Sequence, residues 1–200
     1  TPQPTDGKLL VVTIRATNPD QDLYLTDLFD AWWDPDEAAV PKSSVYPEGK
    51  STQEITEQNT QAMVESQDNA AVAALRHLGL DPNQVKVQLN LANVGGPSAG
   101  LMFSLGIVDQ LGDVNLTGGE IIAGTGTIDA DGKVGPVGGV EMKTKAAKRD
   151  GATVFLLPEH ECGNAEKAAP DGLRLVPVDT LTEAIGALTA LQNGGKVPSC

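Results

Sequence analysis

The stretch NVGGPSAGLMFSLGIVDQL, from Asn93 to Leu111, begins with two glycines, a proline and a serine and then becomes almost wholly apolar. Pro97 fits the first turn of a helix, where its missing N–H costs no hydrogen bond. The helix that follows, to Leu111, is apolar nearly all round, so it is predicted to lie at the centre of the fold. A polar residue, Ser98, stands at the start of this central helix, and its role is the main question that the sequence raises.

Working outward from this stretch, strands and helices alternate along the chain, which predicts an α/β (α+β) fold with mixed sheets and packed helices. Asp34 to Gly49 contains three prolines and is predicted to be a loop. Strands are predicted over residues 8–17, 85–94, 152–158 and 173–178, with two more between residues 120 and 137 joined near Asp131-Gly132. Helices are predicted over residues 23–34, 51–78, 97–111, 138–151 and 180–192.

Charge and composition exclude several partners. The 200 residues carry a formal net charge of −13, which repels nucleic acid and anionic membranes. The longest apolar runs are far shorter than a membrane span. The opening residues TPQPTDGK lack the apolar core of a signal peptide and look like a trimmed end, which is compatible with an anchor upstream of residue 1. Trp32 and Trp33 are adjacent and cannot both face one core stripe, which leaves one of them for an interface or for burial elsewhere.

The two cysteines, Cys162 and Cys200, allow two interpretations. They are either two free thiols or a disulfide that holds the Gly- and Pro-containing tail NGGKVPSC. A disulfide would stabilise the fold by about 4 kcal/mol in the chain-entropy model. It would also place the protein outside the cytosol. No zinc site and no cofactor are expected, because His160 and Cys162 form no recognised ligand pair with His77.

Three roles for Ser98 remain open from its surroundings. GPSAG satisfies G-x-S-x-G, the nucleophile elbow of α/β-hydrolases, but the single downstream histidine, His160, lies in a charged loop. Gly95 and Gly96 at a helix start could cradle an anion, although the loop has no basic residue. The third interpretation is that Ser98 simply begins a helix and has no chemical role.

A nucleophilic serine without a usable histidine needs another base, and a lysine serves if burial keeps its amine neutral. On the helix after Gly139, residues step by about 100°. Lys143 falls within roughly 60° of Val140, on the stripe that faces the core, whereas Lys145 and Arg149 fall on the opposite side. The alternative is a lysine whose stem packs while its amine reaches water.

These residues together resemble the proteolytic domain of the Lon proteases. The family has a P-S-A-G serine, a T-G strand, a V-x-P-[VI]-G-G segment and a lysine on the next helix. All four occur here in that order, in GGPSAG (residues 95–100) and TGTIDADGKVGPVGGVEMKTKAAKRDGATVFLLP (residues 125–158). The resemblance covers residues 85–192 and implies a catalytic pair of Ser98 and Lys143. It also implies that Thr125 hydrogen-bonds the lysine.

The sequence is more similar still to a bacterial subgroup, the secreted, membrane-anchored Lon-like proteases that contain a PDZ domain. VGGPSAGLMF, SQDNAAVAALRHLG and a terminal cysteine are typical of it. Residues 1–84 then form an N-terminal strand, helix, Pro-rich loop and long helix packed on the protease core. The core is residues 85–192, and residues 193–200 are a tail. The PDZ domain expected near residues 79–85 is absent, since only LDPNQ bridges those elements.

The resemblance implies an ATP-independent serine endopeptidase that cleaves unfolded or flexible polypeptides. The backbone N–H groups of Ser98 and Ala99 are the expected oxyanion donors, an inference from the helix start. The implied partners are polypeptide substrates and a ring-like homo-oligomer, in a full-length protein anchored to the cell membrane on its extracytoplasmic side. The alternatives are a non-catalytic peptide-binding scaffold and a hydrolase-like esterase using Ser98 and His160.

Overall fold

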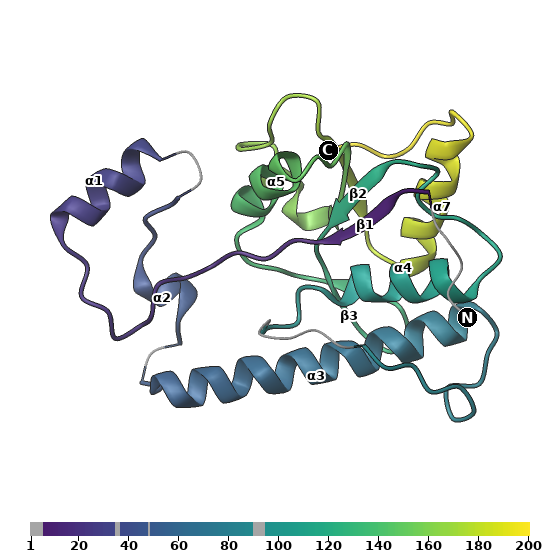
Figure 1. Cartoon of the computed structure of the whole chain (residues 1–200), viewed down its shortest axis with the longest axis horizontal. Coiled ribbons are helices and arrows are strands. Elements are labelled where there is room, and N and C mark those ends of the chain that lie inside the picture. The colour runs from purple at the N-terminus through teal and green to yellow at the C-terminus, as the bar shows by residue number, and fades with distance from the viewer. Residues whose placement is uncertain (1–5, 35–36, 48, 90–94) are drawn as a thin grey trace.

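A computed structural model describes residues 6–34, 37–47, 49–89 and 95–200. Its centre is a parallel sheet of four strands in the order β1-β2-β5-β6 (Figure 1). A second, two-stranded antiparallel sheet follows β2 along the chain and turns near Asp131-Gly132, as predicted. The strands are β1 (Lys8–Val11), β2 (Ile121–Gly124), β3 (Thr127–Ile128), β4 (Val134–Gly135), β5 (Val154–Pro158) and β6 (Arg174–Val178).

Helices cover both faces of the parallel sheet, because alternate side chains of each strand point to opposite faces. On β5, Val154 and Leu156 belong to one apolar cluster, together with the buried faces of α3, α4 and α7. Phe155 and Leu157 belong to another, with α5 and α6. The molecule therefore has three layers, and β5 is buried on both sides. The helices are α3 (Thr52–His77), α4 (Gly100–Leu111), α5 (Val140–Arg149), α6 (Cys162–Ala165) and α7 (Leu181–Gln192), with a short 3₁₀ turn at Glu159–Glu161.

The ends of the long helix α3 follow the capping signals in the sequence. The Ser51 side chain accepts from the N–H of Glu54, and the Glu54 carboxylate accepts from the N–H of Ser51. At the other end Gly79 adopts a φ of 70°, the left-handed conformation that commonly follows a helix. The helix thus begins and ends within a residue of its predicted limits.

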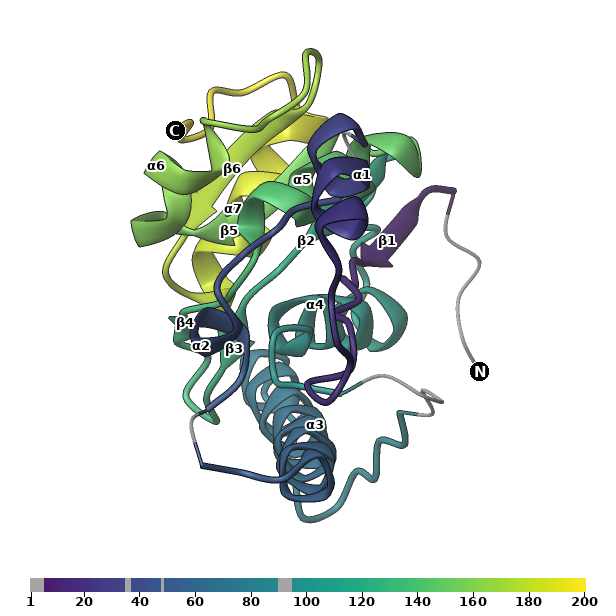
Figure 2. The same ribbon diagram turned by 90° about the vertical axis from the view of Figure 1, so that its left-hand side faces the viewer.

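An N-terminal arm, described over residues 13–34 and 37–47, leaves the sheet after β1 and carries α1 (Leu25–Trp33) and α2 (Lys42–Val45). Figure 1 shows α1 standing apart from the layered body, and in Figure 2, viewed from that side, α1 lies in front of it. No residue of α1 is buried. Trp32 and Trp33 are 82% and 81% exposed, so neither tryptophan packs within the chain.

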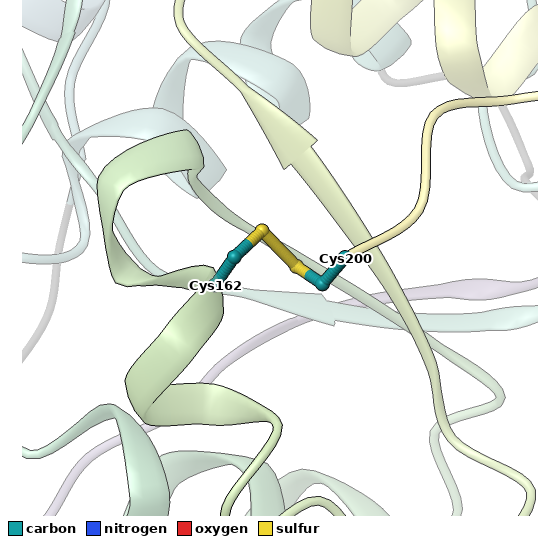
Figure 3. Close-up of a disulfide and its surroundings, with 2 residues drawn as sticks. All are labelled: Cys162 and Cys200. Carbon is teal, nitrogen blue, oxygen red and sulfur yellow. A yellow bond between two sulfur atoms is a disulfide. The ribbon is translucent and has the colours of Figure 1, made fainter.

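A disulfide joins Cys162, at the start of α6, to Cys200 (Figure 3). Of the two interpretations of these cysteines, the structure therefore has the cross-link. It connects the tail after α7 to the segment that follows β5.

Several sequence predictions need correction. Within the predicted loop from Asp34 to Gly49, Lys42–Val45 forms the short helix α2. The first strand predicted between residues 120 and 137 is two strands, β2 and β3, which belong to different sheets. Residues 85–89 form no strand, although Val85, Val87 and Leu89 alternate in exposure with their neighbours; residues 90–94 lie outside the described residues. Alternating exposure shows only that one side of the segment is buried, whereas a β-strand also needs a neighbouring strand to which it is hydrogen-bonded. α4 begins at Gly100 rather than Pro97, because the Pro97 carbonyl closes a turn onto the N–H of Gly100. β1 ends at Val11, where its partner β2 ends.

Two further observations concern the chain as a whole. β1, from the predicted segment 1–84, hydrogen-bonds β2 in residue-by-residue register, so that segment and the protease core share one sheet. Within the described residues, no helix combines the length and the apolar character that a membrane crossing needs.

Candidate active site

The segment around Ser98 lies against the chain just beyond β2. The N–H of Gly126 donates to the carbonyl of Ser98 at 2.9 Å, and the N–H of Leu101 donates to the carbonyl of Gly126 at 3.0 Å. Thr125 continues the pairing of β2 with β5, since its N–H donates to the carbonyl of Leu156 at 2.9 Å. The serine is thereby fixed at the carboxyl edge of the parallel sheet, where open α/β sheets place their ligand sites.

Helix α3 holds the other side of this segment. Ser66 is 3% exposed, and its hydroxyl donates to the carbonyl of Pro97 at 2.9 Å. Seven residues earlier on α3, the carbonyl of Asn59 accepts from the N–H of Gly96 at 2.9 Å. Ser98 itself is half-buried. The glycines and proline thus make a turn that is tied down on two sides.

Two glycines allow this close approach. A Cβ on Gly100 would lie 2.9 Å from both the Ser66 hydroxyl and a methyl of Ile128. A Cβ on Gly126 would lie 2.9 Å from Val134. Any larger residue at either position would push the serine segment away from its neighbours.

Lys143 reaches the same place from α5. This helix starts after Gly139, whose φ of 66° turns the chain sharply into it. Lys143 is 3% exposed, so it does lie on the core-facing stripe and its amine does not reach water. Lys145 is half-buried and Arg149 is exposed.

A chain of two hydrogen bonds links the lysine to the serine backbone. Nζ of Lys143 donates to Oγ1 of Thr125 at 3.0 Å, and Oγ1 of Thr125 donates to the carbonyl of Ser98 at 3.2 Å. Thr125 is fully buried. The threonine therefore contacts both residues that the sequence singled out.

Burial is the main cause of an unusual charge state at this site. It lowers the pKa of Lys143 from 10.5 to about 8, because desolvation disfavours the ammonium form. The carboxylate of Glu161 opposes this and raises the pKa. Near neutral pH a substantial minority of the molecules therefore carries a neutral amine at this position.

Glu161 was not predicted from the sequence to belong to this site. Its side chain is 13% exposed, accepts a hydrogen bond from Asn164 at 3.1 Å, and lies 3.8 Å from Nε2 of His160. The sequence did indicate its position. PEHEC (residues 158–162) comes at the end of the buried strand β5, so Glu161 lies at the same sheet edge as Thr125. Because PEHEC is short and charged, it was predicted to be a solvated loop and not part of the site.

The structure also shows the contacts of the other residues predicted for the site, namely the Ser98 hydroxyl, the expected oxyanion donors and His160. Within the described residues, the Ser98 hydroxyl and the Lys143 amine form no hydrogen bond with each other, and Thr125 stands between their two segments. The N–H groups of Ser98 and Ala99 have no acceptor in that part of the chain either. The side chain of His160 is 51% exposed, its Nε2 lies 3.8 Å from the Glu161 carboxylate, and it forms no hydrogen bond with Ser98 within the described residues.

A hollow of about 460 Å³ lies at the same sheet edge, but Ser98, Thr125 and Lys143 are not part of its lining. Its walls include Thr127, Ile128, Pro136, His160 and Asp179. Among the described residues, His, Cys, Asp and Glu form no group of three or more that could hold a metal ion. The site is thus a buried amine and a half-buried hydroxyl, which are both in contact with Thr125 through the hydrogen bonds above.

Comparison with known proteins shows the family to which the chain belongs. Residues 40–190 match the family described as Lon protease (S16) C-terminal proteolytic domain. The chain belongs to the Lon proteases. The mixed α/β architecture, with its parallel sheet and packed helices, agrees with a Lon proteolytic domain, and the family is one of proteases.

Individual Lon proteases resemble the chain over similar lengths. Lon protease 2 of Bacillus subtilis is 32% identical over 57% of this chain and 21% of its own length. The archaeal Lon protease of Methanocaldococcus jannaschii is 30% identical over 60% of this chain and 18% of its own length. The Lon protease of Chloroflexus aggregans is 29% identical over 68% and 18%, respectively. The chain thus spans about a fifth of the length of the relatives it matches.

Proposed function

We propose that this chain is a serine endopeptidase that uses Ser98 as nucleophile and Lys143 as general base. The observation that supports it most is the buried Lys143 amine, hydrogen-bonded to Thr125, which in turn binds the carbonyl of Ser98. A buried cation without a carboxylate in hydrogen-bond contact is costly, and such costs concentrate at functional sites.

The proposed reaction has two halves. Neutral Lys143 takes the hydroxyl proton of Ser98 as Oγ attacks the peptide carbonyl, and a tetrahedral oxyanion forms. The resulting ammonium then gives this proton to the departing amine, so the peptide bond breaks and an acyl-enzyme remains. A water molecule repeats the cycle: it gives a proton to Lys143, attacks the ester and releases the acid with Ser98 restored.

The proposed oxyanion donors are the N–H groups of Ser98 and Ala99. Both belong to the turn that leads into α4, and both lack an acceptor within the described residues. Donors that already point toward the developing charge need no reorganisation during the reaction. Loss of one such donor typically costs about 10²–10³ in kcat.

We further propose that hydrolysis by this chain requires no ATP and acts on unfolded or flexible polypeptides. None of the residues in the proposed chemistry belongs to a nucleotide-binding motif. Residues 44–51, SVYPEGKS, end as a Walker A motif does, but Ser44 stands where that motif needs its first glycine. The expectation of an unfolded or flexible substrate follows from the half-buried position of Ser98, since a peptide backbone must leave its own folded structure to reach such a side chain.

The disulfide supports an extracytoplasmic location, because such bonds persist in oxidising compartments. We propose this location, with membrane anchoring of the full-length protein and kinship to the PDZ-containing Lon-like proteases. Alkylation of thiols in intact cells, followed by mass measurement, tests the location. Cys162 and Cys200 should resist alkylation until a reductant is added.

The decisive experiment is cleavage of casein without nucleotide by wild type, Ser98→Ala, Lys143→Ala and His160→Ala. Wild type and His160→Ala should cleave, and the other two should be inactive while retaining a native circular dichroism spectrum. Loss of activity in His160→Ala alone would favour a histidine-based esterase. Binding of casein by wild type and Ser98→Ala without cleavage by either would indicate a scaffold.

A further inference from the structure

Ser66 is a polar side chain in apolar surroundings, and its hydrogen bond leaves its own helix. It is buried, and the other buried positions of α3 are all apolar. Elsewhere on α3, the hydroxyls of Thr56 and Thr60 donate to carbonyls one turn earlier in the same helix, as helical hydroxyls commonly do. The Ser66 hydroxyl instead donates to the carbonyl of Pro97 at 2.9 Å. It therefore supports the turn that contains Ser98 rather than α3 itself.

The carbonyl that accepts this hydrogen bond belongs to the same peptide unit as the N–H of Ser98. The bond between Pro97 and Ser98 is trans. A peptide unit is planar, and in its trans form the C=O and the N–H point in opposite directions. By fixing the direction of the Pro97 carbonyl, the Ser66 hydroxyl also fixes the direction of the Ser98 N–H, which leaves the turn on the side away from α3.

The next peptide unit along the turn is held in the same way by other donors. Its carbonyl, that of Ser98, accepts from the N–H of Gly126 at 2.9 Å and from Oγ1 of Thr125 at 3.2 Å. Its N–H is that of Ala99, whose φ of −93° and ψ of −5° are those of the third residue of a type I turn. Successive carbonyls of such a turn lie on one side. The two proposed oxyanion donors, the N–H groups of Ser98 and Ala99, therefore both leave on the other.

We propose that Ser66 is a positioning residue whose hydroxyl orients the N–H of Ser98 toward the oxyanion that forms during peptide hydrolysis. The inference rests on the proposed function of Ser98 as nucleophile, and it adds a residue from a helix that supplies none of the reacting groups. Donors stabilise a developing charge best when they are already oriented before the reaction. Because Ser66 is buried, it acts through this peptide unit and not by contact with the substrate.

Removing the hydroxyl tests this role through kcat. Ser66→Ala leaves the helix intact, since alanine is a strong helix former, and circular dichroism checks the fold. For a fluorogenic peptide, kcat should fall about tenfold, which is less than the 10²–10³ that complete loss of an oxyanion donor costs. KM should stay the same. The midpoint of the pH profile should also stay the same, because the hydrogen bond between Lys143 and Thr125 is retained.

A peptide aldehyde with the sequence of that substrate measures the oxyanion contact separately. Oγ of Ser98 adds to the aldehyde carbon and the hydroxyl proton passes to the aldehyde oxygen, so a tetrahedral hemiacetal forms with this oxygen in the oxyanion position. In Ser66→Ala the inhibition constant of the aldehyde should increase by the factor by which kcat/KM falls. The inhibition constant of the corresponding peptide amide, whose carbonyl stays trigonal, should not change.

Ser104→Ala is the matched control. Ser104 is also a buried serine where α3 meets α4, and its hydroxyl donates to the carbonyls of Ala70 and Gly100 at 3.3 and 3.1 Å. Neither carbonyl shares a peptide unit with the N–H of Ser98 or Ala99. The control therefore loses comparable hydrogen bonds but should keep the wild-type kcat and the wild-type inhibition by the aldehyde.

Two further variants keep a donor at position 66. Ser66→Thr retains a hydroxyl and should recover most of the rate. Ser66→Cys has a weaker donor, so its kcat should lie between those of wild type and Ser66→Ala, and it replaces the alanine variant if that one does not fold.

The outcomes separate this inference from the proposed function. A wild type that does not cleave the peptide, or cleavage that persists in Ser98→Ala, would overturn the proposed function and this inference with it. Cleavage that depends on Ser98 but is undiminished in Ser66→Ala, or is equally diminished in Ser104→Ala, would overturn this inference alone. An unchanged inhibition constant of the aldehyde in Ser66→Ala would do the same.

Discussion

Nζ of Lys143 lies 3.0 Å from Oγ1 of Thr125, and both side chains are buried. Among the described residues Thr125 is the hydrogen-bond partner of this amine, and burial lowers the pKa of Lys143 to about 8. Four of the predictions below depend on this relationship, and the fifth concerns the disulfide.

The rate of peptide hydrolysis should rise with pH through about 8. With a pKa near that value, about a tenth of Lys143 is neutral at pH 7, so kcat/KM should increase about tenfold to a plateau above pH 9. A fluorogenic peptide assayed across this range gives the midpoint. A pH-independent rate would contradict a lysine base.

Replacing Glu161 with Gln should move that midpoint to lower pH. The carboxylate favours the ammonium form of Lys143, and its neutral isostere does not. Activity at neutral pH should therefore increase, while the plateau rate stays near that of wild type. Glu166→Gln, an exposed neighbour on the same segment, is the matched control and should leave the midpoint in place.

Lys143→Met should abolish hydrolysis and yet stabilise the fold. A lysine pKa lowered from 10.5 to about 8 means that protonation favours the unfolded chain, at a cost of roughly 3 kcal/mol at pH 7. The lost hydrogen bond to Thr125 returns about 1 kcal/mol of this. The free energy of unfolding should thus increase by about 2 kcal/mol in urea titrations at pH 7.

The pH dependence of the free energy of unfolding gives a second check. Wild type should gain stability as the pH rises from about 8 towards 10.5, because over that interval the unfolded chain binds the extra proton. Lys143→Met lacks this rise, so the two stability curves should cross, and at high pH wild type should be the more stable by about 1 kcal/mol, the contribution of its hydrogen bond to Thr125. A constant difference between them would mean that packing rather than ionisation separates the two proteins.

Thr125→Val should lower kcat by about 10- to 100-fold with little change in KM, since general-base catalysis as a whole contributes about 10²–10⁴. Valine keeps the shape but removes the hydroxyl that orients the amine. Thr125→Ser restores a hydroxyl and should recover most of the rate. Equal losses in the two variants would indicate a packing role instead.

Removing the disulfide should cost about 4 kcal/mol of stability, because it closes a loop across a sequence separation of 38. Cys162→Ser, Cys200→Ser and the double variant should lose the same amount, as each removes one and the same cross-link. Thermal unfolding of wild type with and without a reductant measures this independently. Additive losses in the double variant would point to contributions from the individual side chains.

The spacing of residues along one helix was enough to single out Lys143. Its place on the α5 stripe depends on local geometry alone, and burial then follows wherever that stripe packs. Glu161 escaped notice because its effect on Lys143 arises between α5 and the turn after β5, which are distant in sequence. Helical spacing likewise predicted α1, but it identifies an apolar face without saying which molecule covers it. Residues 85–89 show the same limit for strands, since alternation cannot reveal a missing neighbour.

The Thr125 hydroxyl has a single proton, and that proton is given to the carbonyl of Ser98. Towards Lys143 the threonine can act only through an oxygen lone pair, whether the amine is charged or neutral. A neutral amine held in this way must turn an N–H towards the threonine, which leaves its own lone pair directed elsewhere. The threonine thus orients the amine of Lys143 without occupying its lone pair, which stays available to take a proton.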